Sequence, residues 1–162
     1  MTNQEGTYVR PLPPSRFFED FEIGEKYIIP SRTQTSGIFA AFQAASGDND
    51  PIHYDIEYCK QRGHPGMFAH GMQVFIQTAA GAGMFPHYAG DSLVAFTEAS
   101  CRFLAPVYAG DTLYPDLEIV ALEPQTTTGV ATLKATVHKQ DGTLTMEGRH
   151  KYVIRKRPAA RR

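Results

Sequence analysis

The spacing of apolar residues changes near residue 93, and this change restricts the folds that the chain can adopt. Before it, apolar residues such as Ile38, Phe39 and Phe42 recur at helical spacing. After it, apolar and polar residues alternate, most clearly over 130–138 and 143–155, as in strands with one buried face. Helices followed by an antiparallel meander predict an α+β fold with the helices on one face of the sheet.

Turn and capping residues set the expected bounds of these elements. Ser36 is expected to cap a first helix that Gly47 ends, and Asp55 to cap a short helix over 56–61. A third helix, expected over 70–84, is apolar on most faces and is therefore predicted to be buried. Strands are expected near 27–29 and over 93–107, 112–122, 130–138 and 143–155, with a tight turn at Asp141-Gly142. One long buried helix wrapped by a curved antiparallel sheet satisfies this pattern.

Length and composition narrow the class of protein. The 162 residues suit a single domain, expected over 17–155, with an extended N-terminal arm over 1–16 and a basic C-terminal tail over 156–162. The formal net charge of -1 gives no reason to expect a nucleic-acid partner, and no apolar run is long enough to predict a membrane span. Two cysteines and a polar beginning without a secretory leader favour a reducing cytoplasm.

The segment from Ser46 to His53 carries the clearest chemical signal. Its central residues Asn-Asp-Pro favour a turn, so the carboxylate of Asp48 and the imidazole of His53 can converge. A carboxylate and a histidine that share a water can exchange protons with it near neutral pH. The alternative is structural: Asp48 would only accept backbone N–H groups in the turn, and His53 would be a surface group.

Gly71 is expected at the start of the buried helix, in Phe68-Ala69-His70-Gly71-Met72. The first N–H groups of a helix have no partner within it, and the helix dipole is positive there. Because glycine has no Cβ, a carbonyl oxygen can approach these donors, which would stabilise an enolate oxygen. The alternatives are that Gly71 only permits close packing of the helix on the sheet and that His70 is structural.

A second constellation is open to a different chemistry. His53 and Asp55, together with His70 or His64, supply the residue types of a two-histidine, one-carboxylate iron site. The expected capping role of Asp55 and the surrounding short helices argue against it. We therefore expect no metal.

Three segments together resemble the MaoC-like dehydratase family, which includes (R)-specific enoyl-CoA hydratases. They are Ser46-Gly-Asp-Asn-Asp-Pro-Ile-His-Tyr-Asp55, Ala69-His-Gly-Met72, and Phe103-Leu-Ala-Pro-Val107 with Gly110-Asp111. The resemblance covers about residues 18–155. It implies a hot-dog fold, a homodimer or dimer of dimers with the active site between subunits, and an acyl-CoA substrate without a separate cofactor.

The family motif Gly-Asp-x-Asn-Pro-x-His gives each residue an implied role. The catalytic acid/base pair falls on Asp48 and His53, and the backbone N–H that binds the thioester oxygen falls on Gly71. Asp50 stands where the family has asparagine, and we expect Asp50 and Met72 to contact the substrate. The implied reaction is syn hydration of a trans-2-enoyl-CoA to a 3-hydroxyacyl-CoA, or its reversal. The alternatives are a hot-dog thioesterase and a non-catalytic acyl-thioester-binding module.

Overall fold

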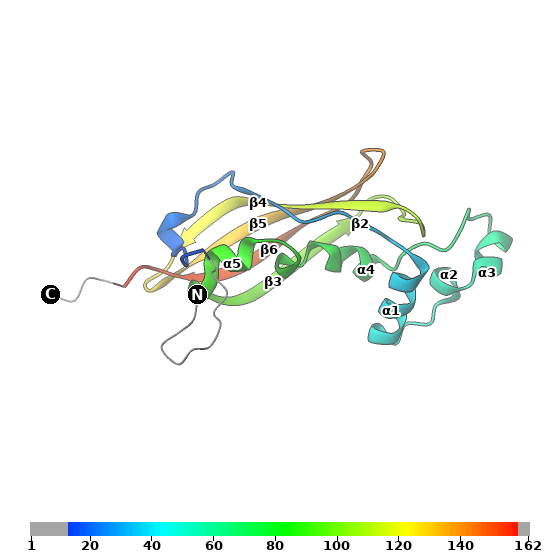
Figure 1. The fold of residues 1–162 in the computed structure, drawn as a ribbon, viewed down its shortest axis with the longest axis horizontal. Coiled ribbons are helices and arrows are strands. Elements are labelled where there is room, and N and C mark those ends of the chain that lie inside the picture. The colour runs from blue at the N-terminus through cyan, green and yellow to red at the C-terminus, as the bar shows by residue number, and fades with distance from the viewer. Residues whose placement is uncertain (1–12, 159–162) are drawn as a thin grey trace, which may run out of the picture.

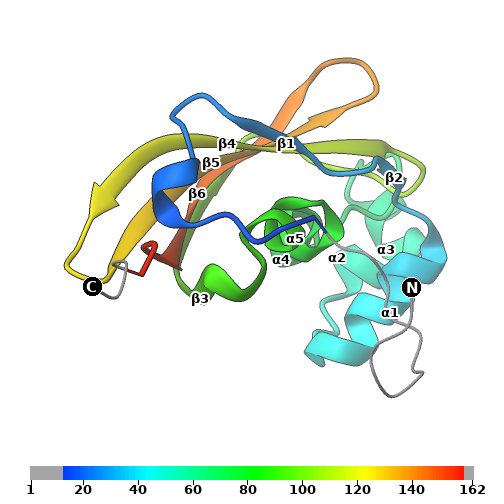
Figure 2. The same ribbon diagram turned by 60° about the vertical axis from the view of Figure 1, so that its left-hand side comes forward.

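The computed structural model describes residues 13–158, which build one curved antiparallel sheet around a helical segment. The sheet has six strands in the order β1-β4-β5-β6-β3, with β2 also paired to β4. The strands are β1 (Lys26–Ile28), β2 (Arg32–Thr33), β3 (Leu93–Phe103), β4 (Thr112–Pro124), β5 (Thr128–Lys139) and β6 (Leu144–Arg155). Figures 1 and 2 show the sheet arching over the helical segment, with the first helices at one end of it.

The four long strands lie where the alternating pattern predicts them. The β5–β6 hairpin turns at Asp141-Gly142, where Gly142 has a φ of 83° and the Asp141 carboxylate accepts the Thr143 N–H. The register of the ladder shifts in β3 and between Ile119 and Ala121 in β4. Such bulges increase the local twist, and they bend the sheet around its contents. The two-residue strand β2 is too short to leave a periodic signal in the sequence.

The core lies between the concave face of the sheet and the helical segment. Alternate residues of the central strands point into it and are fully buried, including Leu117, Leu133 and Met146. Phe85 fills the other side of this core, and its ring packs against the rings of Phe21, Tyr27 and Tyr152. This arrangement confirms the expected α+β architecture.

The helical segment is broken, contrary to the single helix expected over 70–84. It consists of α4 (Gly71–Phe75), the 3-10 turns η2 (Ile76–Thr78) and η3 (Ala80–Ala82), and α5 (Phe85–Ala89). The Thr78 hydroxyl donates to the Phe75 carbonyl, and Ala79 then adopts an extended ψ of 122° that ends the turn. Pro86 stands in the first turn of α5, where its missing N–H costs nothing.

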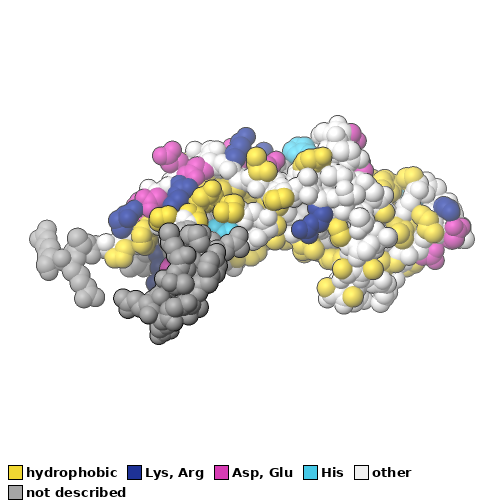
Figure 3. All heavy atoms as spheres, in the orientation of Figure 1, with side chains coloured by type: hydrophobic (Ala, Val, Ile, Leu, Met, Phe, Trp, Pro, Cys, Tyr) yellow, Lys and Arg dark blue, Asp and Glu magenta, His cyan; other side chains and the backbone are white. Residues whose placement is uncertain are grey.

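In the first part of this segment, polar side chains are buried and some apolar side chains are exposed, the reverse of an ordinary amphipathic helix. Gln73, Gln77 and Thr78 face the sheet and are buried, whereas Met72 and Ile76 are nearly half exposed. The Gln77 amide bonds to the Gln73 carbonyl, and the Gln73 amide nitrogen to the Gln34 side chain, whereas the side-chain oxygen of Gln73 is buried without a hydrogen-bond partner. Figure 3 shows apolar side chains gathered on the face that carries this segment and β3.

The first three helices begin at N-cap residues, and a glycine ends the first of them. They are α1 (Ser36–Ser46), α2 (Pro51–Tyr54) and α3 (Ile56–Gln61). Gly47 ends α1 with a left-handed φ of 72°, and Asp55 caps α3, as predicted. The N-cap of α1 is Thr35, one residue before the predicted Ser36, because the Thr35 hydroxyl accepts the Ile38 N–H. Two further 3-10 turns, η1 (Phe18–Asp20) and η4 (Gly90–Ser92), lie near the other end of the sheet.

The chain ends are described only in part. Most of the expected arm over 1–16 lies outside the described residues, but Arg16 is held by hydrogen bonds to Glu25 and to the Tyr88 carbonyl. In the tail, Arg157 pairs with Asp20, and residues 159–162 lie outside the described range. Within residues 13–158, every helix is too short or too polar to cross a bilayer.

Candidate functional site

Asp48 is placed by the end of α1. Gly47 turns the chain out of the helix, and the Asp48 N–H then donates to the Ser46 hydroxyl at 3.1 Å. The Asp48 carboxylate turns back toward the next residues, and its Oδ1 accepts the Asp50 N–H at 2.8 Å. Asp48 remains about one quarter exposed, so water and a ligand can reach its carboxylate.

His53 is placed by the short helix α2. Asp50 caps this helix by accepting the Ile52 N–H, and Pro51 occupies the first turn, so the turn predicted here is in fact helical. The ring of His53 is buried, and its Nδ1 lies 2.6 Å from the Phe68 carbonyl oxygen. A carbonyl oxygen can only accept, so Nδ1 carries the proton and Nε2 of the neutral ring carries a free lone pair.

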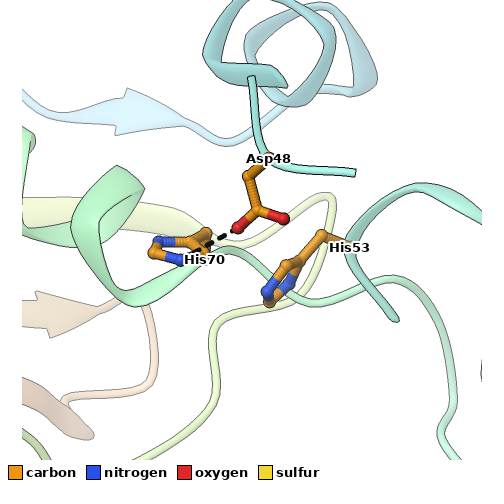
Figure 4. A group of neighbouring side chains, drawn as sticks. All are labelled: Asp48, His53 and His70. Carbon is orange, nitrogen blue, oxygen red and sulfur yellow. Dashed lines mark ion pairs between the residues drawn. The ribbon is translucent and has the colours of Figure 1, made fainter. Parts of the chain in front are cut away.

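His70 completes the group from the other side, at the N-cap of α4. Its Nδ1 accepts the Met72 N–H at 3.0 Å, which places the proton of the neutral ring on Nε2. This Nε2 lies 3.0 Å from Asp48 Oδ2 and donates to it (Figure 4). The contact joins the Asp48 segment to the start of α4, and it makes His70 part of the group.

The three side chains form one compact group. One nitrogen or oxygen atom from each of Asp48, His53 and His70 lies within 4.8 Å of the others. The Asp48 carboxylate therefore has a donor on each oxygen and a histidine lone pair beside it. Burial, followed by the charge of Asp48, raises the pKa of the neighbouring Tyr54 phenol, which remains protonated at neutral pH.

The donor set does not suit a metal ion, although its spacing does. A metal requires a lone pair on Nε2 of His70, but that nitrogen carries the proton as long as Nδ1 accepts the Met72 N–H. The iron site considered from the sequence also required Asp55, and this carboxylate is committed to the N–H groups of Glu57 and Tyr58. The hydrogen bonds fix the tautomers of the two neutral histidine rings.

Gly71 opens onto a cavity of about 350 Å³ beside this group. The cavity is lined mainly by apolar residues: His53, Phe68, Ala69, Gly71, Val74, Phe103, Leu104, Ala105, Pro106, Val107 and Thr145. It brings the imidazole of His53 and the backbone of Gly71 to one space. Asp48 and His70 are not among its lining residues, but one side-chain atom of each lies within 4.8 Å of the His53 ring. The cavity therefore joins the imidazole of His53 to the first residue of α4.

A second, more apolar cavity lies farther along the helical segment, between η2, η3 and β3. Phe75, Ile76 and Phe96 line it, and His150 and Tyr152 form its polar side. The Thr78 hydroxyl donates to the Phe75 carbonyl, so His150 Nε2–H donates to Thr78 and its Nδ1 accepts from the Tyr152 hydroxyl. Burial lowers the pKa of His150 and raises that of Tyr152 to about 12.

Asp50 and Met72, the predicted substrate contacts, lie on the two helices that carry His53 and Gly71. Asp50 is exposed and serves as the cap of α2, and Met72 is nearly half exposed on α4, next to Gly71. On β3, the exposed Arg102 pairs with Glu147.

Comparison with known proteins assigns the family. A model of the MaoC like domain matches residues 20–140. The chain belongs to the MaoC-like family. An (R)-specific enoyl-CoA hydratase from Aeromonas caviae is 27% identical over 134 residues, which are 80% of this chain and 92% of that protein. A monoamine oxidase regulatory protein from Archaeoglobus fulgidus matches in structure with a TM-score of 0.82 and 31% identity, covering 89% of this chain and 97% of that one.

The fold of this MaoC-like chain is the hot-dog fold. A Mycobacterium tuberculosis protein described as a double hot-dog fold matches with a TM-score of 0.74 and 25% identity. The match covers 91% of this chain and 46% of that one, so this chain corresponds in length to one of two such units. The sheet and helical segment described above thus confirm the hot-dog fold implied by the sequence motifs.

Proposed function

We propose that this protein hydrates a trans-2-enoyl-CoA to an (R)-3-hydroxyacyl-CoA, or catalyses the reverse dehydration, with Asp48 and His53 as its acid/base pair. The observation that carries the proposal is that the Asp48 carboxylate lies beside His53, whose imidazole lines the same cavity as Gly71. The activity of the Aeromonas caviae relative, an (R)-specific enoyl-CoA hydratase, supports it. Two coupled groups such as Asp48 and His53 can act as acid and base in turn, because a proton gained by one is shared with the other.

The reaction places one water between Asp48 and His53. The water oxygen bonds to C3 of the substrate, and its proton passes to the pair through the lone pair on His53 Nε2. The electrons of the C2–C3 double bond move onto the thioester oxygen, which becomes an enolate oxygen. The pair then returns the proton to C2 as the enolate collapses, so one water is added and no other reactant is consumed.

Gly71 is proposed to hold the thioester oxygen during this step. It is the first residue of α4, and a first-turn N–H has no partner within its helix. The enolate oxygen carries more charge than the ground-state carbonyl, so a hydrogen bond from Gly71 stabilises the transition state more than the substrate. Asp50 and Met72 are proposed to contact the substrate, because both flank this group and present exposed side chains.

We also propose that the protein works as a homodimer joined along β3. This strand is the last in the sheet order, so one of its edges is unpaired within the described chain. The exposed apolar residues Ile76, Val94 and Phe96 lie on it or beside it. A second copy seated there would cover these residues and close the cavities next to the site. The two free cysteines agree with the proposed cytoplasmic location.

Incubation with crotonyl-CoA separates the candidate activities. Hydration predicts loss of the ultraviolet absorbance of the conjugated thioester with no release of free thiol. A thioesterase releases CoA, which a thiol reagent detects, and a non-catalytic module leaves both signals unchanged while still binding the ligand. Either of the last two results would contradict the proposed function.

A further inference from the structure

His70 bonds in opposite directions through its two nitrogens. Nδ1 accepts the Met72 N–H, and Nε2 donates to Asp48 Oδ2, both at 3.0 Å. Its ring stacks on Phe42, with centroids 5.3 Å apart and planes at 26°, and it meets the edge of the His53 ring at 5.1 Å. These contacts fix the ring plane, its tautomer and the direction of its one N–H donor.

Asp48 has few other restraints on its side chain. The Asp50 N–H holds Oδ1, and His70 holds Oδ2, so the two donors together define the plane of the carboxylate. With Oδ1 held alone, the carboxylate can rotate about its remaining bond and move away from His53. A displacement of about 1 Å at a reacting group can cost on the order of a hundredfold in rate.

We propose that His70 is a positioning residue that holds the Asp48 carboxylate beside His53 for the reaction, an inference that rests on the proposed function. It acts through Asp48 and bonds to no part of the substrate. Its tautomer is set by the backbone of α4, the helix that also presents Gly71. One imidazole therefore couples the position of the carboxylate to the position of the N–H that receives the thioester oxygen.

The two nitrogens of His70 can be tested separately. An asparagine side chain ends near the position of the histidine Nδ1, and a glutamine side chain near that of Nε2. His70→Asn keeps an acceptor for the Met72 N–H, since asparagine is among the best N-caps, but places no donor near Asp48. His70→Gln places an amide donor near Asp48 Oδ2 but caps the helix less well. A purely structural role and a positioning role therefore predict opposite orders of activity.

The experiment measures kcat and KM with crotonyl-CoA, and thermal stability, for the full chain carrying each substitution. We expect His70→Asn to keep Tm within about 3 °C of the wild type and KM within about twofold, and to lower kcat at least about tenfold. His70→Gln should lower Tm further than His70→Asn but recover kcat to within about threefold of the wild type. His87→Asn changes an exposed residue of α5 away from the group, serves as the control and should leave kcat, KM and Tm unchanged.

Two outcomes overturn the inference. One is a kcat for His70→Asn within about twofold of the wild type, and the other is a His70→Gln variant as impaired as His70→Asn. Asp48→Asn is measured alongside and distinguishes this failure from failure of the proposed function. If Asp48→Asn is inactive while the His70 variants are unaffected, only the inference fails. If Asp48→Asn is fully active, the proposed acid/base pair fails.

Discussion

A Cβ atom on Gly71 would lie 2.7 Å from Cε2 and 2.9 Å from Cζ of Phe103, closer than side chains approach in folded proteins. The Phe103 ring belongs to the end of β3 and lines the cavity next to His53. Because the ring is half exposed, it can rotate away from an added methyl group, but only by changing the wall of this cavity. Gly71 is therefore required for the present shape of this cavity.

Gly71→Ala should lower kcat/KM for crotonyl-CoA at least about tenfold and destabilise the fold by about 1–3 kcal/mol through overpacking. The control is Gly81→Ala in η3, where an added Cβ meets nothing within 4 Å. Steady-state kinetics and thermal unfolding of both variants make the comparison. Equal kinetics for the two variants would show that Phe103 does not confine the site.

The parts of this molecule that the sequence predicts are those set by local chemistry. Gly47 ends α1 and Asp55 caps α3 because each needs only its immediate neighbours. The alternating strands follow from one buried face, and the resemblance to the MaoC-like family located Asp48 and His53.

The parts that escaped prediction depend on contacts between distant segments. His70 reaches Asp48 only because the chain between them folds back through α2 and α3, so spacing gave no signal for the contact. The break after Thr78 depends on a hydroxyl that bonds to its own backbone and to His150 on β6. The available hints were the adjacency of His70 to Gly71 and its grouping with His53 as a candidate metal ligand, and residue type alone could not separate a structural histidine from one in the site.

Stability should fall as the pH is lowered, in part because of His150. Burial lowers the pKa of this histidine, so its ring stays neutral in the folded protein at a pH where the unfolded chain binds a proton. The stabilising contribution is complete above the unfolded pKa of about 6.5 and is lost as the pH falls below it. We expect the decrease in Tm between pH 7 and pH 5 to be smaller for His150→Gln than for the wild type. The exposed His87→Gln should show the wild-type decrease, and an unchanged decrease in His150→Gln would contradict this account.

The proposed dimer predicts that a charge placed next to β3 separates the subunits. Ile76→Lys adds a cation to the exposed side of η2, which a second copy would bury without a partner for the charge. Ile28→Lys is the matched control, because Ile28 is more exposed but lies on β1, at the opposite edge of the sheet. Sedimentation should show a dimer for the wild type and for Ile28→Lys, and a shift toward monomer for Ile76→Lys. A monomeric wild type would rule out the proposed assembly.

Asp50 should affect the binding of a CoA thioester more than the stability of the protein. Asparagine caps a helix as well as aspartate, so Asp50→Asn should leave Tm within about 2 °C of the wild type. Removing a carboxylate next to a polyanionic ligand reduces repulsion, so we expect KM to fall by about two- to fivefold at low salt. The difference should shrink as salt screens the charges. If the KM of Asp50→Asn equals that of the wild type at every salt concentration, Asp50 lies away from the substrate.

Asp48→Asn tests most directly whether Asp48 and His53 act as one acid/base pair. The asparagine is nearly isosteric with aspartate and can still accept the Asp50 N–H, so the fold should persist, as circular dichroism and thermal unfolding would verify. In a correctly folded Asp48→Asn protein, we predict that turnover of crotonyl-CoA falls by about a hundredfold or more, the loss typical of removing acid/base catalysis. Turnover close to that of the wild type would contradict the account.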